Sequence, residues 1–181
     1  MEEEDIYEGC VRGDNASRKA LYDCYAGRLL ALGMRYMGNR EEAEDVLHDV
    51  FITVFSSIGR FAYRGKGSLF AWMSRIMVNA ALEQLRKAKF HSEVAVESVQ
   101  DELLDDDGSD MELVPKNVLM HLISELPDGY RTVFNLYAFE GKSHREIASL
   151  LGINEKSSSS QFYRARTMLM KKINEYIKKT I

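Results

Sequence analysis

Apolar side chains recur every three or four residues along most of this chain, the spacing that places them on one face of an α-helix. The clearest stripe runs down one segment and consists of Ala43, Val46, Leu47, Val50, Phe51, Val54, Phe55 and Ile58. The segment from Leu21 to Tyr36 repeats the spacing, and the alternation typical of strands is almost absent. We therefore predict an all-α protein.

Polar residues and glycines between the stripes mark where helices end. Gly38 predicts the end of one helix, and Asn39 with Glu42 three residues later predicts a capped start for the next. These two helices should form an antiparallel hairpin. A turn-rich stretch over residues 59–68 follows, and a third long helix over 69–89 completes a small helical domain.

The next segment differs in composition from everything around it. Residues 91–114 hold 9 Asp and Glu and no Lys or Arg, with little periodicity. Such a segment cannot bury enough apolar surface to fold. We predict a flexible acidic linker at 91–115, between helical domains at 1–90 and 116–181.

The second domain carries helix signals of its own. Residues 116–139 predict two short helices. Ser143 and Glu146 form a capping box for a further helix that Gly152 ends, and Ser157 is placed to cap a long last helix. A short capped helix, a glycine turn and a longer basic helix predict a helix-turn-helix.

The net charge of −4 conceals a segregation along the chain. Residues 1–59 hold 6 Lys and Arg against 12 Asp and Glu, whereas residues 60–90 hold 7 against 1. Residues 115–181 hold 11 against 6. Two basic segments on either side of the acidic linker indicate a polyanion bound at two places.

The last helix has two chemically distinct faces. Its core face consists of Ser158, Phe162, Ala165, Leu169, Ile173 and Tyr176. The opposite face presents Ser159, Ser160, Tyr163 and Arg164, and candidate phosphate contacts nearby are Arg145, Arg166, Lys171 and Lys172. Such groups suit the major groove of DNA. The simpler alternative is a solvated helical face.

The predicted helix over residues 69–89 also bears a polar stripe, made of Arg75, Asn79, Glu83 and Arg86. The loop before it combines aromatic and basic residues with two glycines. Aromatic faces and cations together suit a single-stranded base and its phosphates. The alternative is that Phe61, Tyr63 and Trp72 belong to the core.

The outer face of the stripe at residues 43–58 is acidic, with Glu41, Glu42, Asp45, His48 and Asp49. It cannot bind DNA, so a basic protein surface is the functional interpretation and a solvated face the alternative.

Other classes of function lack support in the sequence. Neither the cysteines nor the histidines have the spacing of a metal site. The sequence also shows no glycine-rich phosphate loop, no nucleophile elbow and no clustered carboxylate pair in an apolar setting. We expect no enzyme activity, no cofactor and no small-molecule substrate. The acidic N-terminus and the short apolar runs favour a cytoplasmic protein without membrane insertion.

Four motifs, at residues 39–51, 64–79, 126–148 and 163–166, resemble the extracytoplasmic-function (ECF) sigma factors of bacterial RNA polymerase. The resemblance covers about residues 10–90 and 116–175. It implies a region 2 domain, a linker and a region 4 domain, and it implies that core RNA polymerase and promoter DNA are the partners. Such factors are commonly held inactive by an anti-sigma factor, which we also expect here.

The resemblance also implies roles for individual residues. Contact with core polymerase falls to Asp45, His48, Asp49 and Phe51. Recognition and melting of the minus-ten element falls to Phe61, Tyr63, Arg64, Lys66, Ser68, Trp72, Arg75 and Asn79, and the polar stripe adds Arg86 as a candidate. Recognition of the minus-thirty-five element falls to Ser157, Ser159, Ser160, Tyr163 and Arg164, and the helix faces add Arg145, Arg166 and Lys171 as candidate phosphate contacts.

Two other hypotheses predict different behaviour. A stand-alone helix-turn-helix regulator would bind a duplex operator tightly by itself, whereas a sigma factor would bind weakly until core polymerase is present. A helical adaptor that binds only proteins would leave the two basic faces and the aromatic loop without a role.

Overall fold

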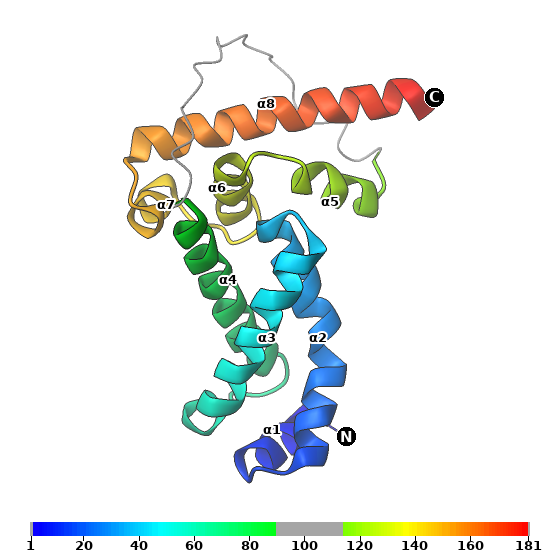
Figure 1. The fold of residues 1–181 in the computed structure, drawn as a ribbon, viewed down its shortest axis with the longest axis vertical. Helices are drawn as coiled ribbons and strands as arrows, with labels where there is room; N and C mark the ends of the chain where they lie inside the picture. Colours follow the sequence, from blue (N-terminus) through cyan, green and yellow to red (C-terminus); the bar gives the residue numbers. More distant parts are fainter. Residues whose placement is uncertain (1, 90–113, 181) are drawn as a thin grey trace. The chain divides into compact units, whose positions relative to one another are not determined.

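A computed structural model describes residues 2–89 and 114–180 of the chain. Over these ranges it contains eight α-helices, one short 3-10 helix and no strand, which confirms the all-α prediction (Figure 1). The chain divides into two compact units, Met1–Arg86 and Lys87–Ile181. The predicted linker at 91–115 lies outside the described residues except for its last two positions.

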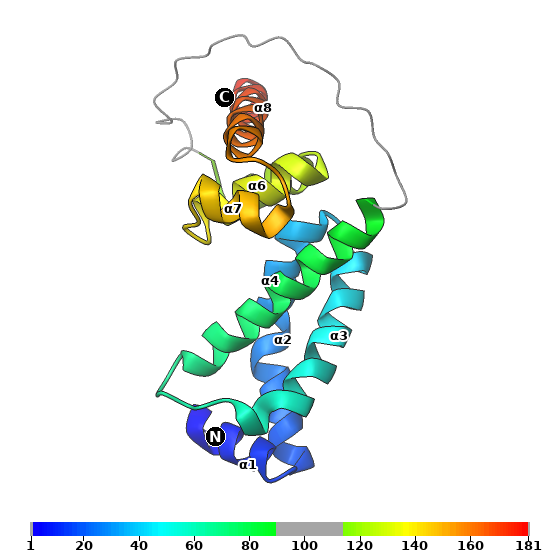
Figure 2. The ribbon, with the colours of Figure 1, turned by 90° about the vertical axis from the view of Figure 1, so that its left-hand side faces the viewer.

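The first unit consists of α1 (Glu3–Val11), α2 (Asn15–Met37), α3 (Arg40–Ser57), the 3-10 helix η1 (Ile58–Arg60) and α4 (Ser68–Lys89). Helices α2 and α3 pack side by side as the predicted antiparallel hairpin (Figures 1 and 2). Helix α1, which the apolar pattern did not predict, packs against α2 and η1.

The turn of the hairpin follows the sequence signals. Gly38 ends α2 in the left-handed conformation at φ 78°, and its N–H donates to the carbonyl of Met34. The side chain of Asn39 accepts a hydrogen bond from the Glu42 N–H at 2.9 Å. Both ends of the turn therefore satisfy backbone groups that a helix leaves open.

The apolar stripe of α3 forms the centre of this unit. All of its members are buried except Phe55, which is half-buried. Leu21 and Leu29 of α2 and Leu69, Met73 and Met77 of α4 are also fully buried. Each such side chain contributes about 1.5–3 kcal/mol when it leaves water.

The second unit consists of α5 (Lys116–Ser124), α6 (Asp128–Ala138), α7 (His144–Leu151) and α8 (Glu155–Thr180). The long α8 lies across the other three helices of this unit (Figure 1). One hydrophobic cluster joins α5, α6 and α8 and contains Val114, Ile123, Leu126, Phe134, Ala165, Leu169, Met170 and Ile173.

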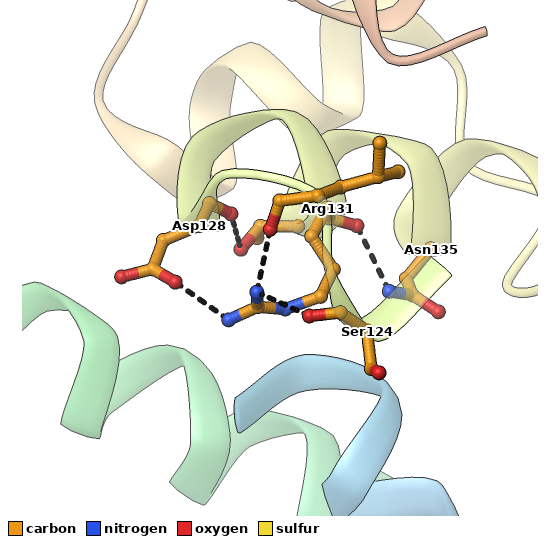
Figure 3. Close-up of polar contacts among 6 residues, drawn as sticks. Ser124, Asp128, Arg131 and Asn135 are labelled. Carbon is orange, nitrogen blue, oxygen red and sulfur yellow. Dashed lines mark hydrogen bonds and ion pairs between the residues drawn. The ribbon is translucent and has the colours of Figure 1, made fainter. Parts of the chain in front are cut away.

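An arginine holds the turn between α5 and α6 (Figure 3). The Arg131 guanidinium donates to the carbonyls of Ser124 at 3.1 Å and Leu126 at 2.7 Å. It also pairs with the Asp128 carboxylate at 2.6 Å. Arg131 thus satisfies carbonyls that the end of α5 would leave without partners, and the side chain of Asn135 in turn donates to the Arg131 carbonyl at 2.8 Å.

The capping box at the start of α7 is present in both directions, between Ser143 and Glu146. Gly152 ends α7 in the left-handed conformation at φ 67°, as predicted. The prediction that Ser157 caps α8 was wrong. The helix begins at Glu155, and the side chain of Asn154 accepts from the Ser157 N–H at 2.7 Å. Ser157 is therefore a donor inside the first turn rather than the cap.

Candidate nucleic-acid and polymerase interfaces

The loop between η1 and α4, residues 61–67, carries the aromatic and basic residues that the sequence singled out, and we call it the aromatic loop. Its first residue, Phe61, stacks on Trp72 of α4 with ring centroids 4.7 Å apart. Tyr63 stacks in the same way on Tyr7 of α1, at 5.2 Å. All three predicted aromatic residues are half-buried, so they offer part of their surface to solvent and part to the unit.

Three basic residues of the aromatic loop and of α4 are exposed. They are Arg64, Lys66 and Arg75, and none of the three side chains has an acidic partner within residues 2–89 and 114–180. Asn79 and Arg86 continue the exposed stripe along α4. Cations that lack an intramolecular partner remain available to phosphates.

The aromatic loop is closed by hydrogen bonds of its own. The Ser68 hydroxyl donates to the Gly65 carbonyl at 2.7 Å and accepts from the Arg64 N–H at 3.1 Å. Ser68, which the resemblance assigned to DNA binding, thus shapes the loop and is half-buried.

Residues of α1 complete this site, and the sequence analysis missed them. The Tyr7 hydroxyl donates to the Phe61 carbonyl at 2.8 Å. The Glu3 carboxylate accepts from the N–H of Gly67 at 2.9 Å and from that of Leu69 at 3.4 Å. It also accepts from the Tyr25 hydroxyl at 3.0 Å, and burial together with this hydrogen bond raises the pKa of the Tyr25 phenol.

Tyr63 shares this acidic surrounding. Partial burial, followed by the negative charges of Glu3 and Glu4, raises the pKa of its phenol above the usual value. A tyrosine phenol is protonated at neutral pH in any case and can donate a hydrogen bond, and the raised pKa extends this protonated range to higher pH.

The acidic face of α3 is fully solvated. Asp45, His48 and Asp49 are exposed, and neither aspartate has an ion pair in the part of the chain that the structure describes. Phe51 is 4% exposed and packs on Tyr22 with ring centroids 4.7 Å apart. Phe51 therefore supports this face from below, and the exposed apolar side chain beside the acids is Ile52, at 58%.

An aromatic cluster joins the two helices of the helix-turn-helix. His144 at the start of α7 stacks on Tyr137 at 4.6 Å, and Tyr137 packs on Phe162 of α8 at 4.3 Å. The His144 Nδ1 lies 3.0 Å from the hydroxyl of Ser158, which is fully buried. These contacts fix α8 against α7.

The outer face of α8 only partly matches the sequence prediction. Ser159, Ser160, Arg166 and Lys171 are exposed, as is Arg145 on α7. Ser157, Tyr163 and Arg164 are half-buried. Arg164 donates to the Tyr130 hydroxyl at 3.4 Å, whereas the Tyr163 hydroxyl is buried without a hydrogen-bond partner among the described residues.

Within the described residues no cluster of metal-ligating side chains is found. None of the helices in those same ranges is long and apolar enough to span a membrane.

Comparison with known proteins assigns both units to one class. The family model for Sigma-70 region 2 matches residues 21–91, and that for Sigma-70 region 4 matches residues 116–169. The two units are therefore those of a sigma-70 type factor.

Individual relatives narrow the class. The ECF RNA polymerase sigma factor SigW of Bacillus subtilis is 30% identical over 176 residues, which cover 91% of this chain and 92% of the relative. The RNA polymerase sigma-H factor of Pseudomonas aeruginosa is 26% identical over 188 residues, covering 98% and 96%. The chain belongs to the ECF RNA polymerase sigma factors. It thus directs RNA polymerase to promoters, and core polymerase and promoter DNA are its partners.

Among solved structures, that of CnrH in complex with the cytosolic domain of CnrY is 22% identical. The match covers 94% of this chain and 96% of the other, at a TM-score of 0.46.

Proposed function

We propose that the two units divide promoter recognition between them. Residues 1–90 act as region 2, which binds core polymerase and opens the minus-ten element, and residues 116–181 act as region 4, which reads the minus-thirty-five element. Residues 91–115 connect them. The observation that carries the proposal is the row of exposed cations without acidic partners beside the half-buried aromatic loop, matched by a second cationic face on the helix-turn-helix.

For the minus-ten element, the proposed contacts are the aromatic loop and the α4 stripe: Phe61, Tyr63, Arg64, Lys66, Trp72, Arg75, Asn79 and Arg86. A base that leaves the duplex needs a ring to stack on and a polar edge to pair with. The half-buried rings of Phe61, Tyr63 and Trp72 supply the first, and Asn79 is an exposed amide on the neighbouring helix face.

For the minus-thirty-five element, the exposed side chains of α7 and α8 are the primary contacts. Ser159 and Ser160 lie in the first turns of α8, where hydroxyls can donate to and accept from base edges. Arg145, Arg166 and Lys171 are placed to contact phosphates. Ser157, Tyr163 and Arg164 are half-buried, and we assign them to the rim of this surface.

For core polymerase, the proposed contact is the acidic face of α3, with Asp45, His48 and Asp49 exposed above the buried Phe51. Charges without an intramolecular partner favour a basic protein surface and speed association with it. The buried aromatic ring of Phe51 keeps that face in place.

Charge reversal tests the polymerase contact. Asp49→Lys should weaken binding to core polymerase by about tenfold or more, because it places like charges together. Glu8→Lys on α1 is the control, since Glu8 is also an exposed acid but lies away from this face. Affinity is measured by titration of fluorescently labelled factor with core. Equal affinity of both variants would contradict the contact.

The minus-ten assignment is tested by Asn79→Ala. Promoter opening, measured by permanganate reactivity of thymines, should fall while affinity for core stays within about twofold, because Asn79 lies on a different helix from the acidic face. A loss of core affinity in this variant would contradict the division of labour.

The competing function, a stand-alone helix-turn-helix regulator, is separated by one further measurement. The purified protein should bind duplex promoter weakly and should initiate transcription once core is added, also from a pre-melted template. Tight binding to duplex DNA by the protein alone, together with no initiation after core polymerase is added, would favour the stand-alone regulator.

We further propose that the protein acts in the cytosol, catalyses no step itself and is regulated by an anti-sigma factor. Membership of the ECF family supports this regulation. Purification of the factor from its own host tests it: a copurifying protein that blocks core binding in a reconstituted assay supports the proposal. Core polymerase as the sole copurifying partner would contradict it.

A further inference from the structure

Helix α1 contacts both ends of the aromatic loop. Tyr7 contacts its first residue, Phe61, and Glu3 contacts its last residue, Gly67, and also Leu69 in the first turn of α4. These contacts join residues 54 to 66 positions apart in the sequence. Figure 2 shows the segment between η1 and α4 passing over α1 on its way to α4.

Glu3 caps the N-terminus of α4, although it is far from this helix in the sequence. Helix α4 begins at Ser68 and has no acidic residue in its first turn. The hydroxyl of Ser68 is used within the loop, because it accepts from the Arg64 N–H and donates to the Gly65 carbonyl. The Glu3 carboxylate therefore supplies both the acceptor and the negative charge that favour a helix start.

Tyr7 fixes the other end of the loop. Its hydroxyl holds the Phe61 carbonyl, its ring stacks on Tyr63, and it meets the Phe61 ring edge-on at 5.8 Å. Phe61 in turn stacks on Trp72. A change at Tyr7 is thus transmitted to the rings proposed to receive a base.

The position of α1 itself is tightly defined. Ile6, Gly9 and Cys10 are buried against the rest of the unit. A Cβ added at Gly9 would collide with the side chain of Ser17 in α2, so there is no room between the two helices at this point. Ser17 is locked there by the Asp14 carboxylate, which its hydroxyl contacts at 2.6 Å.

Helix α1 is a poor candidate for direct contact with DNA, because its first turn consists of Glu3, Glu4 and Asp5. Carboxylates repel phosphates, so any effect of α1 on promoter recognition has to pass through the loop that it holds.

We propose that Glu3 and Tyr7 are positioning residues for promoter opening, which hold the aromatic loop in the shape that receives a minus-ten base. This inference rests on the proposed function of that loop. It assigns a role in sequence selectivity to a helix that lies outside the segment matched by the region 2 model, residues 21–91.

The test uses the full-length factor with core polymerase and two conservative variants. Glu3→Gln keeps the size of the side chain but removes its charge, and Tyr7→Phe removes only the hydroxyl. The matched controls are Glu8→Gln, on the same helix without a loop contact, and Tyr176→Phe, whose hydroxyl makes no hydrogen bond in the described part of the chain.

Two readouts separate positioning from a general loss of folding. Trp72 is the single tryptophan, so its emission reports on the loop directly. The ratio of open-complex formation on a consensus and on a mutated minus-ten element does not depend on how much protein is folded. We expect both test variants to shift Trp72 emission and to lower this ratio about tenfold, as expected for the loss of a charge-assisted hydrogen bond or of a partly buried one.

Controls with normal emission and an unchanged ratio complete the expected result. If Glu3→Gln and Tyr7→Phe behave like their controls in both readouts, the inference is overturned. The variant Arg75→Ala distinguishes failure of the inference about α1 from failure of the proposed function. A normal Arg75→Ala variant means that the loop and α4 do not open promoters, whereas a defective one beside normal α1 variants refutes only the role of α1.

Discussion

The aromatic loop and the turn of the helix-turn-helix are both short irregular segments, but they are held in different ways. The turn is held by local contacts: Glu146 bonds Ser143, Gly152 ends α7, and Asn154 bonds Ser157, each within a few residues. The loop has local hydrogen bonds through Ser68 as well, but both of its ends are also held from α1, by partners more than fifty residues away. The caps of the turn are encoded in its own sequence, whereas the loop also depends on the folded unit.

This difference has consequences for stability and for function. Local caps form with their helix and tolerate changes elsewhere in the chain. A loop held by remote contacts moves when its support moves, even if its own residues are unchanged. Substitutions that remove the α1 contacts should therefore affect the first unit, and substitutions that remove the α7 cap should affect the second.

The largest effect is expected from Gly9→Ala. The new methyl group collides with Ser17, and overpacking of this kind costs about 1–3 kcal/mol and displaces α1. Gly27→Ala is the matched control: Gly27 lies exposed within α2 with nothing near its Cβ, so alanine should stabilise the helix by about 0.5–1 kcal/mol.

Urea unfolding followed by Trp72 emission measures both glycine variants, since this tryptophan lies in the first unit. Gly9→Ala should also shift the emission of the folded protein. A stability equal to that of the parent, with normal emission, would show that α1 does not support the loop.

A smaller effect, confined to the second unit, is expected from Ser143→Ala. Loss of the N-cap of α7 should cost about 1 kcal/mol. Amide hydrogen exchange should rise in α7 and leave the aromatic loop unchanged. Ser149→Ala, at an exposed position inside the same helix, should be neutral or slightly stabilising. Faster exchange in the loop of the Ser143 variant would mean that the two segments are coupled.

The smallest expected effect is a change in how the stability of α7 depends on pH in the acidic range. The hydrogen bonds from Ser143 lower the pKa of Glu146 below its usual value of 4.5. A lowered pKa in the folded state stabilises α7 above pH 4.5, and this contribution is lost as the pH falls through the folded pKa.

Glu146→Gln keeps an acceptor in the capping box and removes the titration. Exchange in α7 should then match the parent at pH 7 and lose part of its acid sensitivity below about pH 4.5. Glu155→Gln, an exposed glutamate without a hydrogen bond among the described residues, should retain the full sensitivity. Identical acid profiles for the two variants would contradict this origin.

The same contrast explains how far the sequence predicted the structure. The stripe of α3 and the signals at Gly38, Asn39 and Gly152 identified their elements because periodicity and caps act within a few residues. The exposed cations of the α4 stripe were placed correctly for the same reason: once one face of a helix is buried, the opposite face is solvated.

The missed features depend on contacts that no local pattern encodes. Helix α1 buries only Ile6, Gly9 and Cys10 among many acids, so it has no apolar stripe to detect. Arg131 is 4% exposed although arginine is ordinarily a surface residue, because its charge is used on the carbonyls of a neighbouring turn. Phe51 was assigned to a contact surface, yet the stripe that predicted its helix also buries it.

The division of promoter reading between two units is tested most directly by a selectivity measurement on the reconstituted holoenzyme. Open-complex formation is compared on promoters mutated in one element at a time, for Asn79→Ala and for Ser160→Ala. We predict that Asn79→Ala loses selectivity for the minus-ten element only, and Ser160→Ala for the minus-thirty-five element only. Loss of both selectivities in either variant, or of neither in both, would contradict the division.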